Sequence, residues 1–142
     1  MIRTIPLVLL LLAFLPVACG GGAEDDPTPV PTPSDVDDEA YLAIICEGLD
    51  AFSDAVDTST TVEQLAASIQ TFIDELQAVA PPADVAEFHT AFTNYLIQSL
   101  DDPTRPLVAP PPLPSDDIRE RLADKERNVT ACKNPTFFAA DE

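Results

Sequence analysis

Three cysteines offer most of the chemistry available to this sequence. They are Cys19, Cys46 and Cys132, in a chain of 142 residues. A cysteine thiol can be acylated, oxidised to a disulfide or bound to a metal ion. Structural zinc sites need four Cys, His or carboxylate ligands, and His89 is the chain's single histidine. We therefore expect no metal site and no cofactor-binding residue.

The remaining reactive side chains indicate no catalytic site. Histidine titrates near neutrality, but Val85, Phe88 and Phe92 lie on the same helical stripe as His89, which favours a structural role. Paired carboxylates can transfer protons or bind calcium, yet adjacent residues of a helix point apart. Such pairs occur at 74–75, 101–102 and 116–117. We assign no catalytic residue and expect that the chain is not an enzyme.

The residues before Cys19 have the pattern of an export signal. Arg3 precedes an apolar run over residues 5–16, and the small residues Val17 and Ala18 lead to the cysteine. The run has about a dozen residues, whereas a helix needs roughly 20 to span a bilayer. A basic start, a short apolar core and small residues before a cut site are typical of a signal peptide. Residues 1–18 are therefore predicted to be a signal peptide and not part of the folded domain.

The end of this signal resembles the lipobox of bacterial lipoproteins. That resemblance implies that Cys19 is acylated, for example with palmitate, and becomes the new N-terminus on the outer side of a bacterial membrane. The sequence departs from the family's pattern at one place, because Pro16 stands where Leu is usual and Leu15 lies one position early. The alternative is ordinary cleavage after Gly20, which would release a soluble secreted protein.

The export signal also decides the pairing of the cysteines. Acylation or cleavage removes Cys19 from the count and leaves Cys46 and Cys132. Exported proteins fold in an oxidising compartment, where disulfides persist. We predict a Cys46–Cys132 disulfide, which stabilises the fold by about 4 kcal/mol in the chain-entropy description of a loop of this length.

Composition divides the mature chain into a tether and a domain. Residues 19–37 are mostly Gly, Asp, Glu, Pro and Thr, which bury too little apolar surface to fold. We predict a disordered acidic tether there, a helical domain over 38–138 and an acidic tail over 139–142.

Charge is distributed unevenly along the chain. The formal net charge is -18, and no Lys or Arg occurs between Thr4 and Thr104. Nucleic-acid binding needs a basic face and is therefore excluded. The acidic charge favours a protein partner with a basic surface. Alternatively, the acidic residues form a solvated surface that keeps the domain soluble.

Apolar periodicity predicts an all-α fold. Stripes of apolar residues with helical spacing predict helices over 38–57, 61–80, 83–100 and 116–131. Six prolines between 101 and 114 exclude a helix there, and Leu107, Val108 and Leu113 are predicted to hold this crossover to the bundle. The expected fold is a small up-and-down bundle of three to four helices. Its fourth helix follows a proline-rich crossover and is tied by one disulfide.

No motif in the sequence names an activity. The stretch 81–89 is similar to a helix start in uncharacterised secreted bacterial helical proteins, a resemblance that supplies no function. The favoured interpretation is a membrane-anchored extracytoplasmic module that binds a ligand or a partner. A structural envelope protein without a specific ligand is the alternative, and a secreted enzyme ranks third.

The lipid anchor can be tested at Cys19. We expect Cys19→Ser to abolish incorporation of labelled palmitate and to change the membrane fractionation of the protein or leave its signal peptide uncleaved. Cys132→Ser is the matched control, because it replaces a cysteine without touching the signal. Unchanged labelling and fractionation of Cys19→Ser would contradict a lipid anchor at this residue.

Overall fold

The computed structural model describes residues 32–134 and 137–139. Within these residues it contains α1 (Asp38–Thr58), α2 (Val62–Gln77), α3 (Ala86–Ser99), η1 (Arg105–Leu107), α4 (Asp116–Glu126), and the short strands β1 (Ser34–Asp35) and β2 (Val79–Ala80). The predicted all-α class is confirmed. None of the described helices has the length and apolar character needed to cross a membrane. The predicted signal, Cys19 and most of the predicted tether lie outside the described residues.

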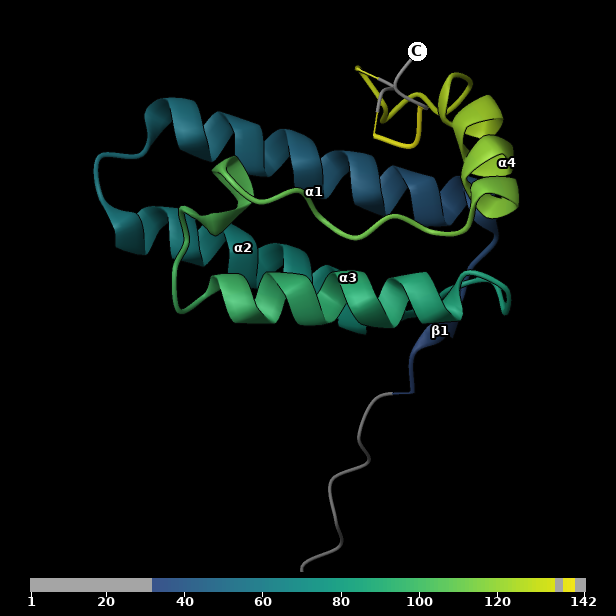
Figure 1. Cartoon of the computed structure of the whole chain (residues 1–142), viewed down its shortest axis with the longest axis horizontal. Coiled ribbons are helices and arrows are strands. Elements are labelled where there is room, and N and C mark those ends of the chain that lie inside the picture. Colours follow the sequence, from purple (N-terminus) through teal and green to yellow (C-terminus); the bar gives the residue numbers. More distant parts are fainter. Residues whose placement is uncertain (1–31, 135–136, 140–142) are drawn as a thin grey trace, which may run out of the picture.

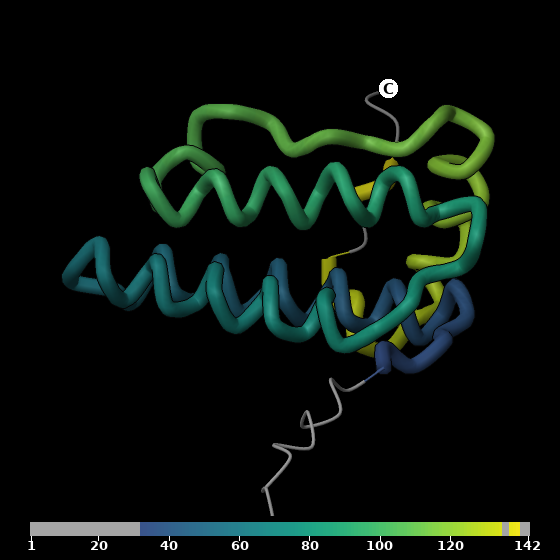
Figure 2. The backbone as a smooth tube through the Cα atoms, turned by 90° about the horizontal axis from the view of Figure 1, so that it is seen from below, coloured from purple at the N-terminus to yellow at the C-terminus, as the bar shows by residue number. Residues whose placement is uncertain are grey.

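The first three helices form an antiparallel layer. Helix α2 packs against both α1 and α3, and short connections join each pair (Figures 1 and 2). Helix α4 lies beside the beginning of α1, at one end of this layer (Figure 1). The predicted bundle of four helices is therefore present, with α4 held separately from the other three.

Side chains cap the first two helices. The Asp37 carboxylate accepts a hydrogen bond from the Ala40 amide at 2.9 Å. Thr61 and Gln64 form a reciprocal capping box at the start of α2. Each interaction satisfies an amide that has no partner within the helix.

The end of α2 differs from the prediction. The helix ends at Gln77 rather than at residue 80, because the next residues pair with the chain that precedes α1. The strands β1 and β2 are parallel, and Val36 donates a hydrogen bond to the Ala80 carbonyl at 3.1 Å. Pro81 disfavours helical backbone at the residue before it, which leaves Ala80 extended and able to pair. Ordered structure therefore begins before residue 38, within the last residues of the predicted tether.

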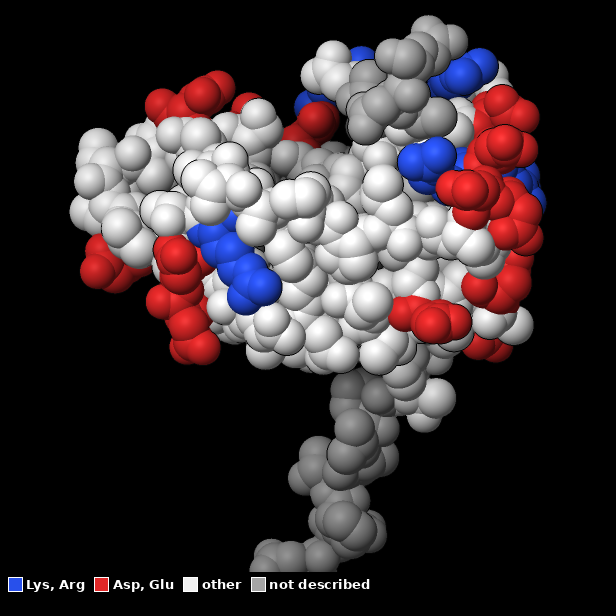
Figure 3. All heavy atoms as spheres, in the orientation of Figure 1, with Lys and Arg blue, Asp and Glu red and all other residues white. Residues whose placement is uncertain are grey.

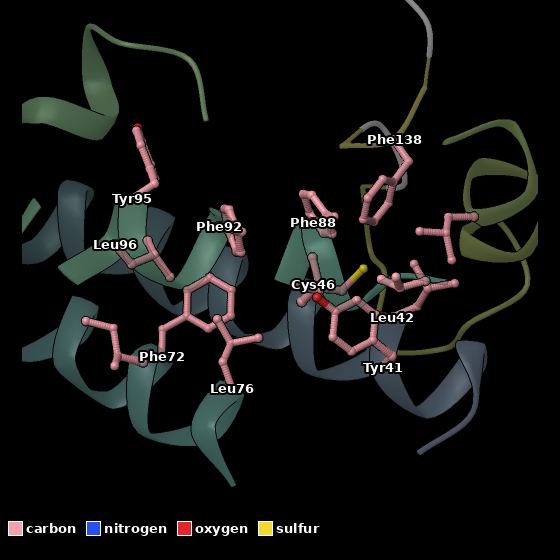
Figure 4. Close-up of a cluster of buried hydrophobic side chains, with 14 of the residues drawn as sticks. Tyr41, Leu42, Cys46, Phe72, Leu76, Phe88, Phe92, Tyr95, Leu96 and Phe138 are labelled. Carbon is pink, nitrogen blue, oxygen red and sulfur yellow. The ribbon is translucent and has the colours of Figure 1, made fainter. Parts of the chain in front are cut away.

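An aromatic row runs through the core. Phe92 lies edge-on to Phe72, with ring centroids 5.7 Å apart, and stacks on Phe88 at 5.6 Å. Phe138, from beyond α4, is fully buried and meets Phe88 at 5.7 Å (Figure 4). Phe137 contacts both Phe92 and Phe138, so the two residues beyond α4 pack on the bundle.

The proline-rich crossover is held by residues other than those predicted. The Tyr95 hydroxyl donates a hydrogen bond to the Ala109 carbonyl at 2.6 Å, and the Arg105 guanidinium lies 5.6 Å from the centre of the Tyr95 ring. The three residues predicted to fix the crossover are instead exposed: Leu107 at 53%, Val108 at 82% and Leu113 at 47%. That prediction was wrong, because one buried tyrosine with a polar tip fixes the backbone and leaves the apolar side chains outside.

Helix α4 is shorter than its pattern predicts. It ends at Glu126 instead of residue 131, and the Asn128 side chain donates to the Asp124 carbonyl at 3.2 Å near its end. The turn that follows brings Cys132 to Cys46, and the two form the predicted disulfide with a Cα–Cα distance of 4.9 Å. Ser115 precedes α4 but its side chain does not cap the helix, since its hydroxyl donates to the Asp117 carboxylate at 2.6 Å.

Gly48 allows α1 and α2 to approach closely, which gives a test of the packing. A Cβ at this position would overlap the buried Phe72 ring. We expect Gly48→Ala to lower the free energy of unfolding, because overpacking costs about 1–3 kcal/mol and opposes the gain of about 1 kcal/mol in helix propensity. Urea unfolding of Gly48→Ala alone and combined with Phe72→Leu measures the coupling. A more stable Gly48→Ala protein would contradict this contact.

Candidate functional site

The disulfide lies beside a buried carboxylate. Glu126, the last residue of α4, is 1% exposed. One of its carboxylate oxygens, Oε1, lies 4.0 Å from the Cys46 sulfur. A disulfide sulfur carries no proton, so this approach is a contact and not a hydrogen bond.

Backbone amides partly satisfy the Glu126 carboxylate. Phe137 donates to one oxygen at 3.3 Å and Phe138 to the other at 3.4 Å. Burial raises the pKa of Glu126, while the amides of Phe138 and Phe137 and the charge of Arg127 act in the opposite direction. In residues 32–134 and 137–139, no Lys or Arg forms an ion pair with this carboxylate. Glu126 therefore holds the C-terminal segment by accepting hydrogen bonds from the backbone amides of Phe137 and Phe138, and not through an ion pair.

A small cavity opens next to the disulfide. Its volume is about 230 Å³, and Cys46, Cys132, Glu126, Asp50 and Ser53 are among the residues that line it. At its edge the Lys133 ammonium lies 2.9 Å from the Asp50 carboxylate, a hydrogen bond that raises the pKa of Lys133. Pockets for drug-sized ligands usually measure about 300–1,000 Å³, so this cavity fits an ion or a few waters better than an organic molecule.

A second cavity lies between α3 and the end of the crossover. It measures about 240 Å³ and combines apolar residues, including Phe88, Ala91 and Leu113, with the carboxylates of Asp84 and Glu87. A lining that combines apolar and acidic residues suits the aliphatic stem and the cationic head of a lysine or arginine side chain.

His89 lies against a tyrosine and not in either cavity. Its Nδ1 is 3.3 Å from the Tyr41 hydroxyl, and the two rings are tilted with centroids 5.8 Å apart. Burial lowers the pKa of His89 and raises that of Tyr41. Both groups are therefore neutral near pH 7, which suits a packing contact.

The acidic pairs are held apart from one another. Asp102 accepts a hydrogen bond from the Thr104 hydroxyl at 2.7 Å, whereas Asp117 accepts from Ser115 at the other end of the crossover. In the described part of the chain, the one group of three metal-ligating residue types brought together is Cys46, Glu126 and Cys132. The structure thus brings together the two predicted cysteines and adds a carboxylate that sequence reasoning missed.

The sequence did contain a signal for Glu126. Ile118 and Leu122 are four residues apart on the apolar stripe of α4, and Glu126 is the next residue at that spacing. A carboxylate on an apolar stripe is buried if the stripe is buried, and such a group needs hydrogen bonds or charge partners. The hydrogen-bond partners of the Glu126 carboxylate come from residues 137 and 138, and the local sequence pattern does not determine where these residues lie.

A second buried carboxylate holds α4 to α1. Asp38, in the first turn of α1, accepts hydrogen bonds from Arg121 and from Lys125, the latter at 2.8 Å. Arg121 also reaches Asp84, just before α3, at 2.6 Å. Burial acts to raise the pKa of Asp38, but the hydrogen bonds and charges of Arg121 and Lys125 outweigh it and hold that pKa below its ordinary value of 3.8.

This cluster predicts a pH-dependent contribution to stability. A carboxyl group whose pKa is lower in the folded state stabilises the fold above its unfolded pKa and loses that effect as the pH falls through the folded value. We expect Asp38→Asn to cost about 1–3 kcal/mol at about pH 7, with the difference from wild type vanishing well below pH 3.8. Urea unfolding of both proteins at about pH 7 and well below pH 3.8 measures this difference in the free energy of unfolding. Asp84→Asn, at a more exposed partner of Arg121, should cost about 0–1 kcal/mol, and a pH-independent Asp38→Asn effect would contradict the ion pairs.

Comparison with known proteins adds no assignment to these features. No family model, curated protein or solved structure matches this chain. Functional inference therefore rests on the chain's own surfaces and clusters. Two of them are distinctive, namely the exposed apolar crossover and the buried group of two cysteines and a glutamate.

Proposed function

We propose that this protein is a membrane-anchored extracytoplasmic interaction module. The lipobox-like signal supports an anchor at Cys19, and the acidic, proline-rich sequence that follows would act as a spacer between the lipid and the domain. If the signal is cut after Gly20 instead, the same module would be secreted in soluble form.

The exposed apolar crossover is the observation that carries this proposal. Leu107, Val108, Pro110 and Leu113 are all exposed, and we call this surface the crossover face. No Asp or Glu occurs between Pro103 and Ser115. Figure 3 shows few charged side chains on the face over which this segment runs, with acidic groups gathered toward its edges. Exposed apolar surface rimmed by polar groups is typical of interaction sites.

The charges around the crossover face indicate the chemistry of its partner. The exposed pairs Asp101–Asp102 and Asp116–Asp117 bracket the segment. A protein with an apolar centre and a basic rim would match both the face and its borders. The cavity lined by Leu113 and Glu87 would accept a basic side chain from that partner. Such an interface weakens as salt screens its rim.

Two other functions have weaker support. A structural envelope protein without a ligand would need no exposed apolar segment, so the crossover face argues for a partner. A secreted enzyme would need a reactive group in a cleft, whereas His89 meets Tyr41 and lines neither of the two cavities described above.

Site-specific cross-linking in the native envelope tests the proposal. A photoreactive residue at Leu107 should yield a discrete adduct with a partner, and Leu113→Asp should reduce its yield at least tenfold by placing a charge in the apolar contact. Added salt should lower the yield because it screens the acidic rim. Val62 is the matched control position, since it is also 53% exposed but lies at the start of α2. Equal adducts from Leu107 and Val62, or none from Leu107, would favour the structural alternative.

A further inference from the structure

We propose that Cys46, Cys132 and Glu126 form a latent binding site for a thiophilic divalent metal ion such as Zn²⁺, which becomes available when the disulfide is reduced. The site is separate from the crossover face and does not depend on the interaction proposed for it. In the oxidised protein the two sulfurs are bonded to each other, and the site is closed.

The burial of Glu126 is the first argument. Buried carboxylates in proteins are normally paired with cations or coordinated to metals, because removing a charge from water is costly. Glu126 is buried more completely than Asp38. Among the described residues, its two oxygens accept from the amides of Phe137 and Phe138, whereas Asp38 pairs with two cations. The Cys46 sulfur of the disulfide lies 4.0 Å from one of these oxygens. A bound cation at this place would supply the counter-charge that no Lys or Arg of the described residues provides.

The spacing of the donor atoms is the second argument. The two sulfurs and a Glu126 oxygen all lie within 4.8 Å of one another. Zinc binds thiolates at about 2.3 Å and carboxylates at about 2.0–2.2 Å, so neighbouring ligands of a tetrahedral ion lie roughly 3.5–4 Å apart. The Cys46 sulfur and Glu126 Oε1 are already 4.0 Å apart. Once the covalent bond is broken, side-chain rotation alone can bring the second sulfur to a similar spacing.

The adjacent cavity is the third argument. Three protein ligands leave one position of a tetrahedral zinc ion open for water. The cavity of about 230 Å³ is lined by all three proposed ligands and is large enough to hold that water. The polar side chains of Asp50 and Ser53 also line it and would offer hydrogen bonds to the bound water.

The chemistry needs a reductant but no other reagent. A dithiol, such as the active site of a thiol–disulfide oxidoreductase, transfers two electrons and two protons to the Cys46–Cys132 bond and becomes a disulfide itself. The metal ion then replaces the two thiol protons, which are released to solvent, and forms two metal–sulfur bonds.

Cobalt binding gives a direct test. The full chain with Cys19→Ser, solubilised in detergent, has Cys46 and Cys132 as its only cysteines. After reduction with a phosphine under anaerobic conditions, addition of Co²⁺ should produce a sulfur-to-cobalt charge-transfer band with one ion per chain. Zn²⁺ should displace the cobalt. The same protein with its disulfide intact should give no such band.

Matched variants separate this site from two thiols that happen to be close. Glu126→Gln should weaken cobalt binding at least tenfold, because the neutral amide is a poor ligand. Glu120→Gln should leave binding unchanged, since Glu120 lies on the exposed side of the same helix. Circular dichroism of each reduced variant reports whether it is folded before and after metal addition.

Three results would overturn the proposal. One is the absence of a charge-transfer band in the reduced chain, whether it stays folded or unfolds. Another is equal affinity in Glu126→Gln and the parent, which would mean that the thiols bind alone. The last is equal cobalt affinity in urea, where the chain is unfolded and its fold does not hold the three ligands together.

Discussion

The Cys46–Cys132 disulfide is the constraint on which the C-terminal third of the domain depends. Helix α4 has eleven residues, and within it Leu122 is the fully buried apolar side chain. A helix of this length with so thin an apolar stripe is marginal by itself. The disulfide fixes the chain just after α4 to the middle of α1, and Asp38 holds Arg121 and Lys125 at the start of α1. With two attachments, α4 has one position, and Phe138 enters the core beside Phe88.

Acidic and basic residues are separated along the sequence, and this separation affects both the ion pairs and the exposed surface of the domain. The basic residues of the domain all follow Thr104. Several of them form ion pairs within the domain: Arg121 pairs with Asp38 and Asp84, and Lys133 pairs with Asp50. These pairs join the late part of the chain to the acidic helices. The crossover carries one arginine, which lies against Tyr95, and its apolar side chains are left facing outward. The proposed interaction surface is thus a consequence of how the backbone of the crossover is held.

Glu126 connects the structural and the chemical properties of the disulfide region. Its carboxylate receives the amides of Phe137 and Phe138 and lies next to the Cys46 sulfur. In the oxidised state this arrangement seals the end of the core. Reduction would leave two thiols and a carboxylate facing one small cavity, a set of donors that suits a thiophilic ion better than either cysteine alone.

Covalent chemistry and local periodicity determined much of the protein from its sequence. The cysteine count and the export signal predict the disulfide, because an even number of cysteines remains to pair. Apolar stripes predict four helices, because helical spacing depends on neighbouring residues alone. Only the tertiary structure decided where α2 ends, which residue holds the crossover and what surrounds Glu126. Ala80 pairs with Val36, Ala109 is held by Tyr95, and Glu126 accepts from Phe137 and Phe138. The first of these contacts joins residues more than 40 positions apart, and the other two depend on segments brought back by the crossover and the disulfide, so no local pattern contains them.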